Sequence, residues 1–187
     1  MSASEVLRRI SAALDHAGIA SMLTGSFASA FHGAPRSTQD IDIVIAANAE
    51  QFVRSLPSAE YYVDLDAALE GHKRQSLFNV IDLATGWKID LIIRKSRAFS
   101  QEEFGRRQLV NAQGPAVFVA SAEDVVIAKL EWSKLAQSRR QIEDAATILK
   151  LRWELLNRPY MERWISELNL NQEWSSAKRI AEISESI

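Results

Sequence analysis

Residues 40–45, Asp-Ile-Asp-Ile-Val-Ile, restrict the possible fold more than any other part of the chain. Side chains alternate between the two faces of a β-strand, so Asp40 and Asp42 lie on one face. Ile41, Ile43 and Ile45 lie on the other face and can be buried there. The stretch therefore predicts a half-buried strand that carries two carboxylates on one side.

The segments around this strand predict a mixed α/β region. A capping box of Ser2 and Glu5 opens a helix over 4–17, and Gly18 ends it. Alternation, periodicity and turn residues then predict strands over 19–24, 78–83, 87–93 and 117–119, and helices over 26–33, 50–56, 64–72 and from Ser100-Glu103 onward. The strands over 78–83 and 87–93 form a hairpin around Thr85-Gly86.

From residue 121 onward the pattern is helical only. Ser121 and Asp124 predict the cap of a helix that runs to about Gln137, and further apolar stripes follow it. The predicted fold class is α/β (α+β), with a small mixed sheet flanked by helices over 1–120 and a C-terminal helical portion over 121–187. Because no Pro/Gly-rich linker separates the two, we expect the helical portion to pack on the core as one structural unit.

Composition excludes several classes of protein. The 187 residues contain no cysteine, which excludes disulfides and thiolate metal sites. The formal net charge of −2 argues against broad, unspecific binding of nucleic acid. No apolar run approaches the length of a membrane span, and the N-terminus lacks the apolar region of a signal peptide. We expect a soluble protein located in the cytoplasm.

Asp40 and Asp42 suggest a site for divalent cations. Their Cα atoms would lie roughly 6.5–7 Å apart on the strand, a spacing that lets the carboxylates bracket two ions about 3.5–4 Å apart. A third carboxylate would complete the site. Asp90 is favoured because its apolar neighbours make an unpaired charge costly. Asp82 occupies a comparable place on the preceding strand, and hairpin register cannot be fixed from sequence, so both remain candidates.

The Gly25-Ser26 pair precedes a predicted helix. Glycine lets the backbone approach a ligand closely, and the free N–H groups at the start of a helix favour a phosphate. A strand, a Gly-Ser turn, a helix and a strand with Asp-x-Asp would place a triphosphate next to metal ions.

These residues together resemble a known family. The pattern of a Gly-Ser turn, a helix, a glycine and Arg-x-Thr-x-Asp-x-Asp is similar to the signature of the DNA polymerase β-like nucleotidyltransferases, in particular the branch around the AbiEii-type toxins. Seven residues match it: Gly25, Ser26, Gly33, Arg36, Thr38, Asp40 and Asp42. Lys129, followed by Arg139, Arg140 and Asp144, is similar to a downstream helical motif of the family. Gln141 departs from that motif, since an aspartate often stands there.

The resemblance implies transfer of a nucleoside monophosphate (NMP) from a nucleoside triphosphate (NTP) to a hydroxyl acceptor, with release of pyrophosphate. Asp40, Asp42 and Asp90 would bind Mg²⁺ or Mn²⁺, and Asp90 would also position or deprotonate the acceptor. Gly25, Ser26, Arg36, Thr38 and Lys129 would contact the nucleotide. The acceptor is a tRNA, a protein or a small molecule. The alternative is a catalytically idle domain of the same fold that binds nucleotide or a partner, for example in a toxin–antitoxin system.

Overall fold

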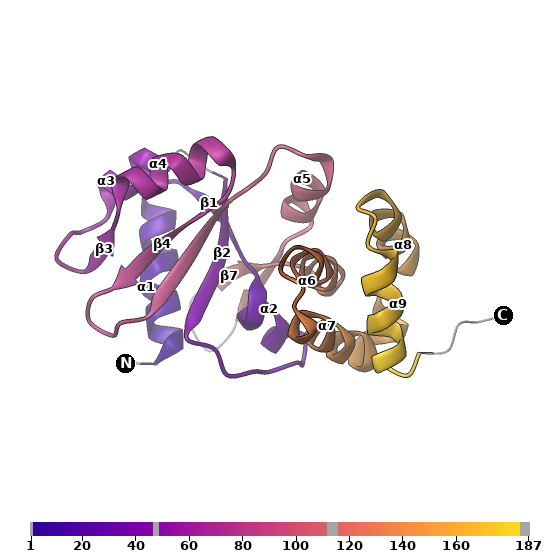
Figure 1. Ribbon diagram of the computed structural model, residues 1–187. Coiled ribbons are helices and arrows are strands. Elements are labelled where there is room, and N and C mark those ends of the chain that lie inside the picture. Colours follow the sequence, from indigo (N-terminus) through magenta and orange to yellow (C-terminus); the bar gives the residue numbers. More distant parts are fainter. Residues whose placement is uncertain (1, 47–48, 112–115, 184–187) are drawn as a thin grey trace. The chain divides into compact units, whose positions relative to one another are not determined.

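The computed structural model describes residues 2–46, 49–111 and 116–183, and these divide into two compact units (Figure 1). The first unit comprises residues 1–26 and 37–120, and the second comprises residues 27–36 and 121–187. The chain therefore enters the second unit early, returns to the first, and enters the second again after residue 120. This division differs from the sequence prediction, which places residues 27–36 with the sheet.

The first unit is built on a mixed sheet, which confirms the predicted fold class. The described part of the sheet has seven strands in the order β3-β4-β5-β2-β1-β7-β6. Two neighbouring pairs, β2 with β5 and β1 with β7, are parallel, and the other pairs are antiparallel. The strands are β1 (Ala20–Leu23), β2 (Asp40–Ala46), β3 (Tyr61–Val63), β4 (Leu77–Asp82), β5 (Lys88–Ile93), β6 (Gln108–Asn111) and β7 (Ala116–Val119).

One face of this sheet is apolar and packs against helix α1 (Ala3–His16). Val6, Ile10 and Leu14 recur every fourth residue and are fully buried, as the helical period requires. Ile43 of β2 and Leu7 of α1 line the same small cavity, so the isoleucine face of β2 lies on the α1 side. The aspartates of β2 therefore point to the opposite face. The described part of the unit also contains α3 (Ala49–Ser55), α4 (Leu65–Arg74) and α5 (Ala98–Gly105).

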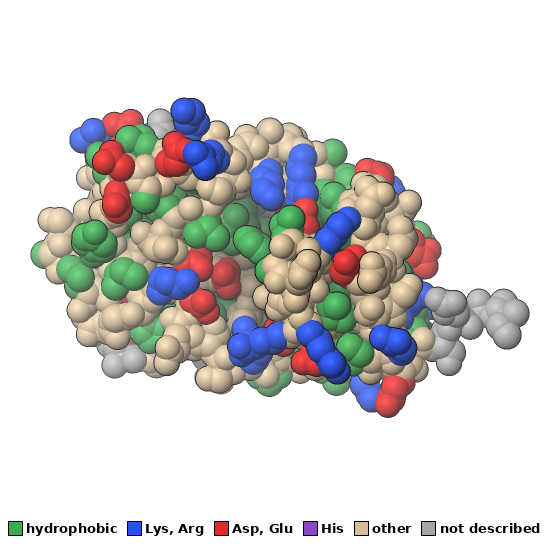
Figure 2. Space-filling model, in the orientation of Figure 1, with side chains coloured by type: hydrophobic (Ala, Val, Ile, Leu, Met, Phe, Trp, Pro, Cys, Tyr) green, Lys and Arg blue, Asp and Glu red, His purple; other side chains and the backbone are tan. Residues whose placement is uncertain are grey.

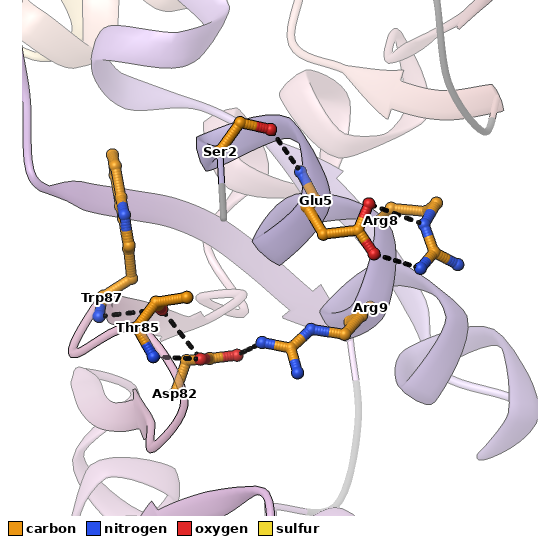
Figure 3. Close-up of polar contacts among 7 residues, drawn as sticks. All are labelled: Ser2, Glu5, Arg8, Arg9, Asp82, Thr85 and Trp87. Atoms are coloured by element: carbon orange, nitrogen blue, oxygen red, sulfur yellow. Dashed lines mark hydrogen bonds and ion pairs between the residues drawn. The ribbon is translucent and has the colours of Figure 1, made fainter.

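The N-terminus of α1 confirms half of the predicted capping box. The Ser2 hydroxyl accepts a hydrogen bond from the Glu5 N–H at 3.4 Å. The Glu5 carboxylate does not return to Ser2, because it pairs with Arg8 one turn along the helix (Figure 3).

The structure differs from the sequence predictions in three elements. Strands β3 and β6 were not predicted, because β3 has three residues and β6 shows no alternation of buried and exposed positions. Helix α5 begins at Ala98, two residues before the predicted Ser100, and Ser100 is buried within its first turn. Alternation and periodicity need longer segments than these to give a signal.

The described residues of the second unit form helices and their connections, and no strands. Helix α2 (Gly25–Phe31) starts in the first unit and continues into the second. The other helices are α6 (Ala122–Ala136), α7 (Arg139–Arg152), the short η1 (Trp153–Leu155), α8 (Arg158–Glu167) and α9 (Asn171–Ile180). The predicted cap of α6 is confirmed, since the Ser121 hydroxyl accepts from the Asp124 N–H at 3.2 Å. No helix among the described residues is both long enough and apolar enough to cross a membrane.

Residues 27–36 are held within this helical unit by α7. The Arg152 Nε donates to the carbonyl oxygen of His32 at 3.1 Å. The ideal Cβ position at Gly33 lies 3.5 Å from a methyl carbon of Leu151. The prediction that the helical portion packs on the sheet unit stays a prediction.

Candidate active site

The strand register places Asp42 and Asp90 side by side. They are direct partners in the parallel pairing of β2 and β5, so their side chains leave the sheet on the same face. Asn79 of β4 is the partner of Asp90 on its other side. The backbone N–H of Thr24 donates to the carbonyl oxygen of Asp42 at 2.9 Å, which extends this row toward β1. Three strands and Thr24, the residue that follows β1, thus contribute neighbouring positions across the sheet.

Asp90 is almost fully enclosed, with 8% of its surface exposed. Its Oδ1 accepts from the Asn79 amide nitrogen at 2.5 Å, and its Oδ2 accepts from the Lys88 Nζ at 3.0 Å. Burying a carboxylate is costly unless it is paired and hydrogen-bonded, and here both oxygens have donors. The side chain is therefore fixed in orientation by two neighbours on the same face.

Lys88 lies among the three acids. It is the strand partner of Asp40, and its Nζ is 3.7 Å from Asp40 Oδ2 in addition to the contact with Asp90. Burial acts to lower the pKa of Lys88, but its hydrogen bond to Asp90 and the charges of the three aspartates outweigh burial and raise the pKa above 10.5. Figure 2 shows carboxylates gathered beside a basic side chain over β2 and β5.

Neither Lys88 nor Asn79 was among the residues predicted for the site. Lys88 precedes Asp90 by two residues, so the alternation of a strand already placed it on the acidic face. Asn79 gave no comparable signal, because its position beside Asp90 depends on the register of β4 and β5.

Asp40 is held from the loop that precedes β2. The Thr38 hydroxyl donates to Asp40 Oδ1 in a close contact. Thr38 thus orients a carboxylate of the site.

The backbone conformation of Gly25 and its lack of a side chain leave room for the Asp42 carboxylate. Its φ of +62° is a conformation that favours glycine. A Cβ atom at this position would overlap the Asp42 carboxylate, so the carboxylate packs directly on the Gly25 backbone. Ser26 follows and is buried. The Gly-Ser turn and the Asp-x-Asp strand are therefore in contact.

Asp82 belongs to the opposite face of the sheet. Asn79 and Asp90 are partners, so by alternation Asp82 of β4 points toward the α1 side. There it is fully buried, pairs with Arg9 of α1 and accepts from the Thr85 N–H and hydroxyl at 3.0 and 2.8 Å (Figure 3). Of the two aspartates left open by the sequence, Asp90 is the one beside Asp42.

Arg36 and Lys129 belong to the helical unit. Lys129 Nζ, on a side chain that is 5% exposed, donates to Asp144 Oδ2 at 2.9 Å and to Gln141 Oε1 at 3.3 Å. Arg36 Nε is 3.4 Å from the same Asp144 oxygen. Gln141, which departs from the family pattern, is thus a direct partner of Lys129. The predicted residues form two groups, one in each unit.

The sheet group offers the donors that Mg²⁺ and Mn²⁺ prefer, namely several carboxylate oxygens. Among the described residues, however, no three His, Cys, Asp or Glu side chains are already arranged to hold a metal ion. Lys88 contacts two of the three carboxylates. The residues fit a divalent cation in kind, and side-chain adjustment around Lys88 would be needed to bind it.

Comparison with known proteins gives the family. The sequence model of DUF6036, a nucleotidyltransferase of unknown function, matches residues 4–183. The chain belongs to this family of nucleotidyltransferases. No curated protein matches the sequence.

Solved structures of nucleotidyltransferases share the fold of this DUF6036 protein. An antigenic nucleotidyltransferase-like protein from Paracoccidioides brasiliensis aligns over 98% of this chain and 94% of its own, with a TM-score of 0.56 and 17% identity. ANT(2")-Ia in complex with adenylyl-2"-tobramycin aligns over 90% and 98%, with a TM-score of 0.58 and 14% identity. The lincosamide antibiotic adenylyltransferase LnuA, bound to lincomycin, aligns over 79% and 98%, with a TM-score of 0.51 and 14% identity. At these identities the likeness establishes the fold.

Proposed function

We propose that this chain is an active, metal-dependent enzyme that transfers an NMP from an NTP to a hydroxyl acceptor and releases pyrophosphate. The observation that carries the proposal is the pairing of Asp42 with Asp90, with Asp40 on the same face and Gly25 packed on Asp42. Membership of a nucleotidyltransferase family supports the reaction class.

In this reaction the acceptor oxygen attacks the α-phosphorus of the NTP. A new O–P bond forms, the bond from the α-phosphorus to the bridging oxygen breaks, and pyrophosphate leaves with that oxygen. Asp90 is suited to position the acceptor hydroxyl and take its proton, since Asn79 fixes its orientation. Gly25 and Ser26 would hold the β- and γ-phosphates.

Asp40, Asp42 and Asp90 would hold Mg²⁺ or Mn²⁺. When bound, such ions stabilise the charge that develops on the attacking and leaving oxygens. Thr38 contributes by orienting Asp40. The family resemblance also implies that Arg36 and Lys129 contact the nucleotide.

The acceptor is a small molecule, a protein or a tRNA. Two of the structural neighbours are antibiotic adenylyltransferases or carry an adenylylated antibiotic, which supports a small-molecule acceptor in this proposal. The resemblance to the AbiEii-type toxins supports a macromolecular acceptor and a role in a toxin–antitoxin system. A panel of acceptors distinguishes these classes.

The test is label transfer from an NTP. With Mg²⁺ and a cell extract as the source of acceptor, the labelling that depends on added protein should put α-phosphate label into an acceptor and γ-phosphate label into pyrophosphate. Asp42→Asn should abolish the transfer, and Asp66→Asn, a change at an exposed aspartate of α4, should leave it intact. Equal labelling by the Asp42 variant and the wild type would refute catalysis at this site.

An idle domain that only binds nucleotide is the second candidate, favoured by the contacts of Lys88 with two of the acids. Calorimetry separates the two functions. Nucleotide binding that persists in chelator, with no pyrophosphate released when metal is restored, supports the idle domain.

A further inference from the structure

The position of Lys88 has a consequence for metal binding. Its Nζ lies 3.0 Å from Asp90 Oδ2 and 3.7 Å from Asp40 Oδ2, so one ammonium group contacts two of the proposed metal ligands. We infer that Lys88 is a built-in counter-cation, which neutralises the acidic face in the metal-free protein and must leave Asp90 when a divalent cation binds. The inference rests on the proposed function for its metal site.

Electrostatic repulsion requires Lys88 to leave Asp90 when a divalent cation binds there. A unit charge and a divalent ion a few ångströms apart repel each other strongly where water is partly excluded. Asp90 is buried, so screening by solvent at its Oδ2 is weak. Lys88 and a divalent cation bound to the same oxygen would therefore oppose each other, and Lys88 lowers the metal affinity by its presence.

The side chain of Lys88 is able to withdraw. It is 42% exposed, and a lysine ammonium sits on a flexible four-carbon stem. Asn79 donates to the other oxygen of Asp90 and carries no charge, so it can stay in place during the exchange. Asp90 would thus keep its orientation while its cationic partner changes. Lys88 therefore acts on metal affinity through its contacts with Asp90 and Asp40.

Mn²⁺ titration by calorimetry tests the inference on the full-length chain. Lys88→Met keeps much of the stem and removes the charge. It should bind Mn²⁺ roughly tenfold more tightly than the wild type, because a positive charge that repels the ion is removed. Lys88→Arg, which keeps the charge, should not gain affinity, and Lys73→Met, at an exposed lysine of α4, should match the wild type. A purely structural role for Lys88 predicts unchanged or weaker binding in Lys88→Met, and that result would overturn the inference.

A second measurement follows Lys88 itself. In ¹H–¹⁵N spectra of lysine ammonium groups, the Lys88 signal is assigned by its loss in Lys88→Met. Saturating Mg²⁺ should shift this signal or broaden it through faster exchange with water, while the Lys73 signal stays in place. An unmoved Lys88 signal at saturation overturns the inference.

Failure of the inference and failure of the proposed function are distinguishable. If Mn²⁺ binds and Lys88 responds as described, but no NMP is transferred, the reaction is wrong and the counter-cation is right. If NMP is transferred and Lys88→Met gains no affinity for Mn²⁺, the proposed reaction is right and the counter-cation role is wrong. If neither the wild type nor Lys88→Met binds Mn²⁺, with or without an NTP, both the inference and the proposed metal site are wrong.

Discussion

Asp82 and Asp90 belong to one hairpin, and both are buried, yet they face opposite sides of the sheet. Asp82 meets one arginine, Arg9, and the two donor groups of Thr85. Asp90 meets a lysine and an amide and has a second carboxylate, Asp42, as its strand partner. An ion pair of opposite charges, such as Asp82 with Arg9, is typical of a structural contact. Clustered carboxylates repel each other and reduce stability, so they are found mainly at functional sites. From this comparison we propose a structural role for Asp82 and a functional role for Asp90.

The largest effect is expected on the structural side. Asp82→Asn removes the charge opposite Arg9, whose side chain is only 19% exposed, and breaking a buried ion pair costs about 3–5 kcal/mol. Urea unfolding should show this loss in the free energy of unfolding, with NMP transfer by the folded fraction unchanged. A stability within about 0.5 kcal/mol of the wild type would contradict the structural role.

Asp90→Asn should show the opposite pattern. The amide keeps the size of the side chain and relieves repulsion with Asp42, but its NH2 group replaces an oxygen that accepts from Lys88 or Asn79. The free energy of unfolding should therefore fall by about 1–2 kcal/mol, less than in Asp82→Asn. NMP transfer should fall roughly a hundredfold or more. Both quantities are measured on the same preparation. A variant that loses stability but retains the rate would reverse the assignment of the two aspartates.

Gly25 and Gly86 sharpen the comparison through the backbone. Both have positive φ, but an added Cβ meets the Asp42 carboxylate at Gly25 and nothing within 4 Å at Gly86. Each change to alanine should cost roughly 1–2 kcal/mol through backbone strain. Only Gly25→Ala should also reduce NMP transfer, because Asp42 has to move. Equal transfer rates in the two variants would show that the contact with Asp42 has no functional weight.

The smallest effect concerns pH. Burial raises the pKa of Tyr61 above 10.0, and although Arg9 opposes this, Asp82, its strand partner, and Glu60 add to it. The unfolded chain therefore loses this proton first, so the stability that Tyr61 contributes is complete below pH 10.0 and declines as pH rises through the folded pKa. Urea unfolding gives the free energy of unfolding at each pH. Between about pH 9 and about pH 11 this free energy should fall less steeply in Tyr61→Phe than in the wild type. Parallel slopes would exclude the effect.

Sequence alone predicts one half of this comparison. Alternation in residues 40–45 places Asp40 and Asp42 on one face, and the structure agrees. The choice between Asp82 and Asp90 needs the register of the β4–β5 hairpin and the pairing of β5 with β2, a strand distant in sequence, and neither leaves a local pattern. The alternation of residues 87–93 could have indicated Lys88 as well, because Lys88 lies two residues before Asp90 on the same face. Asn79 could not have been indicated in this way, because amide residues occur on many strands without a role.

Residues 27–36 create a practical constraint on dissecting the molecule. His32 and Gly33 are secured by Arg152 and Leu151, which stand more than a hundred positions downstream. A fragment that stops after residue 120 would lack the side chains that hold residues 27–36, a segment that begins directly after Ser26 and ends two residues before Thr38. Truncation after residue 120 would therefore disturb the segment that joins the Gly25-Ser26 turn to strand β2. The DUF6036 chain is best studied whole.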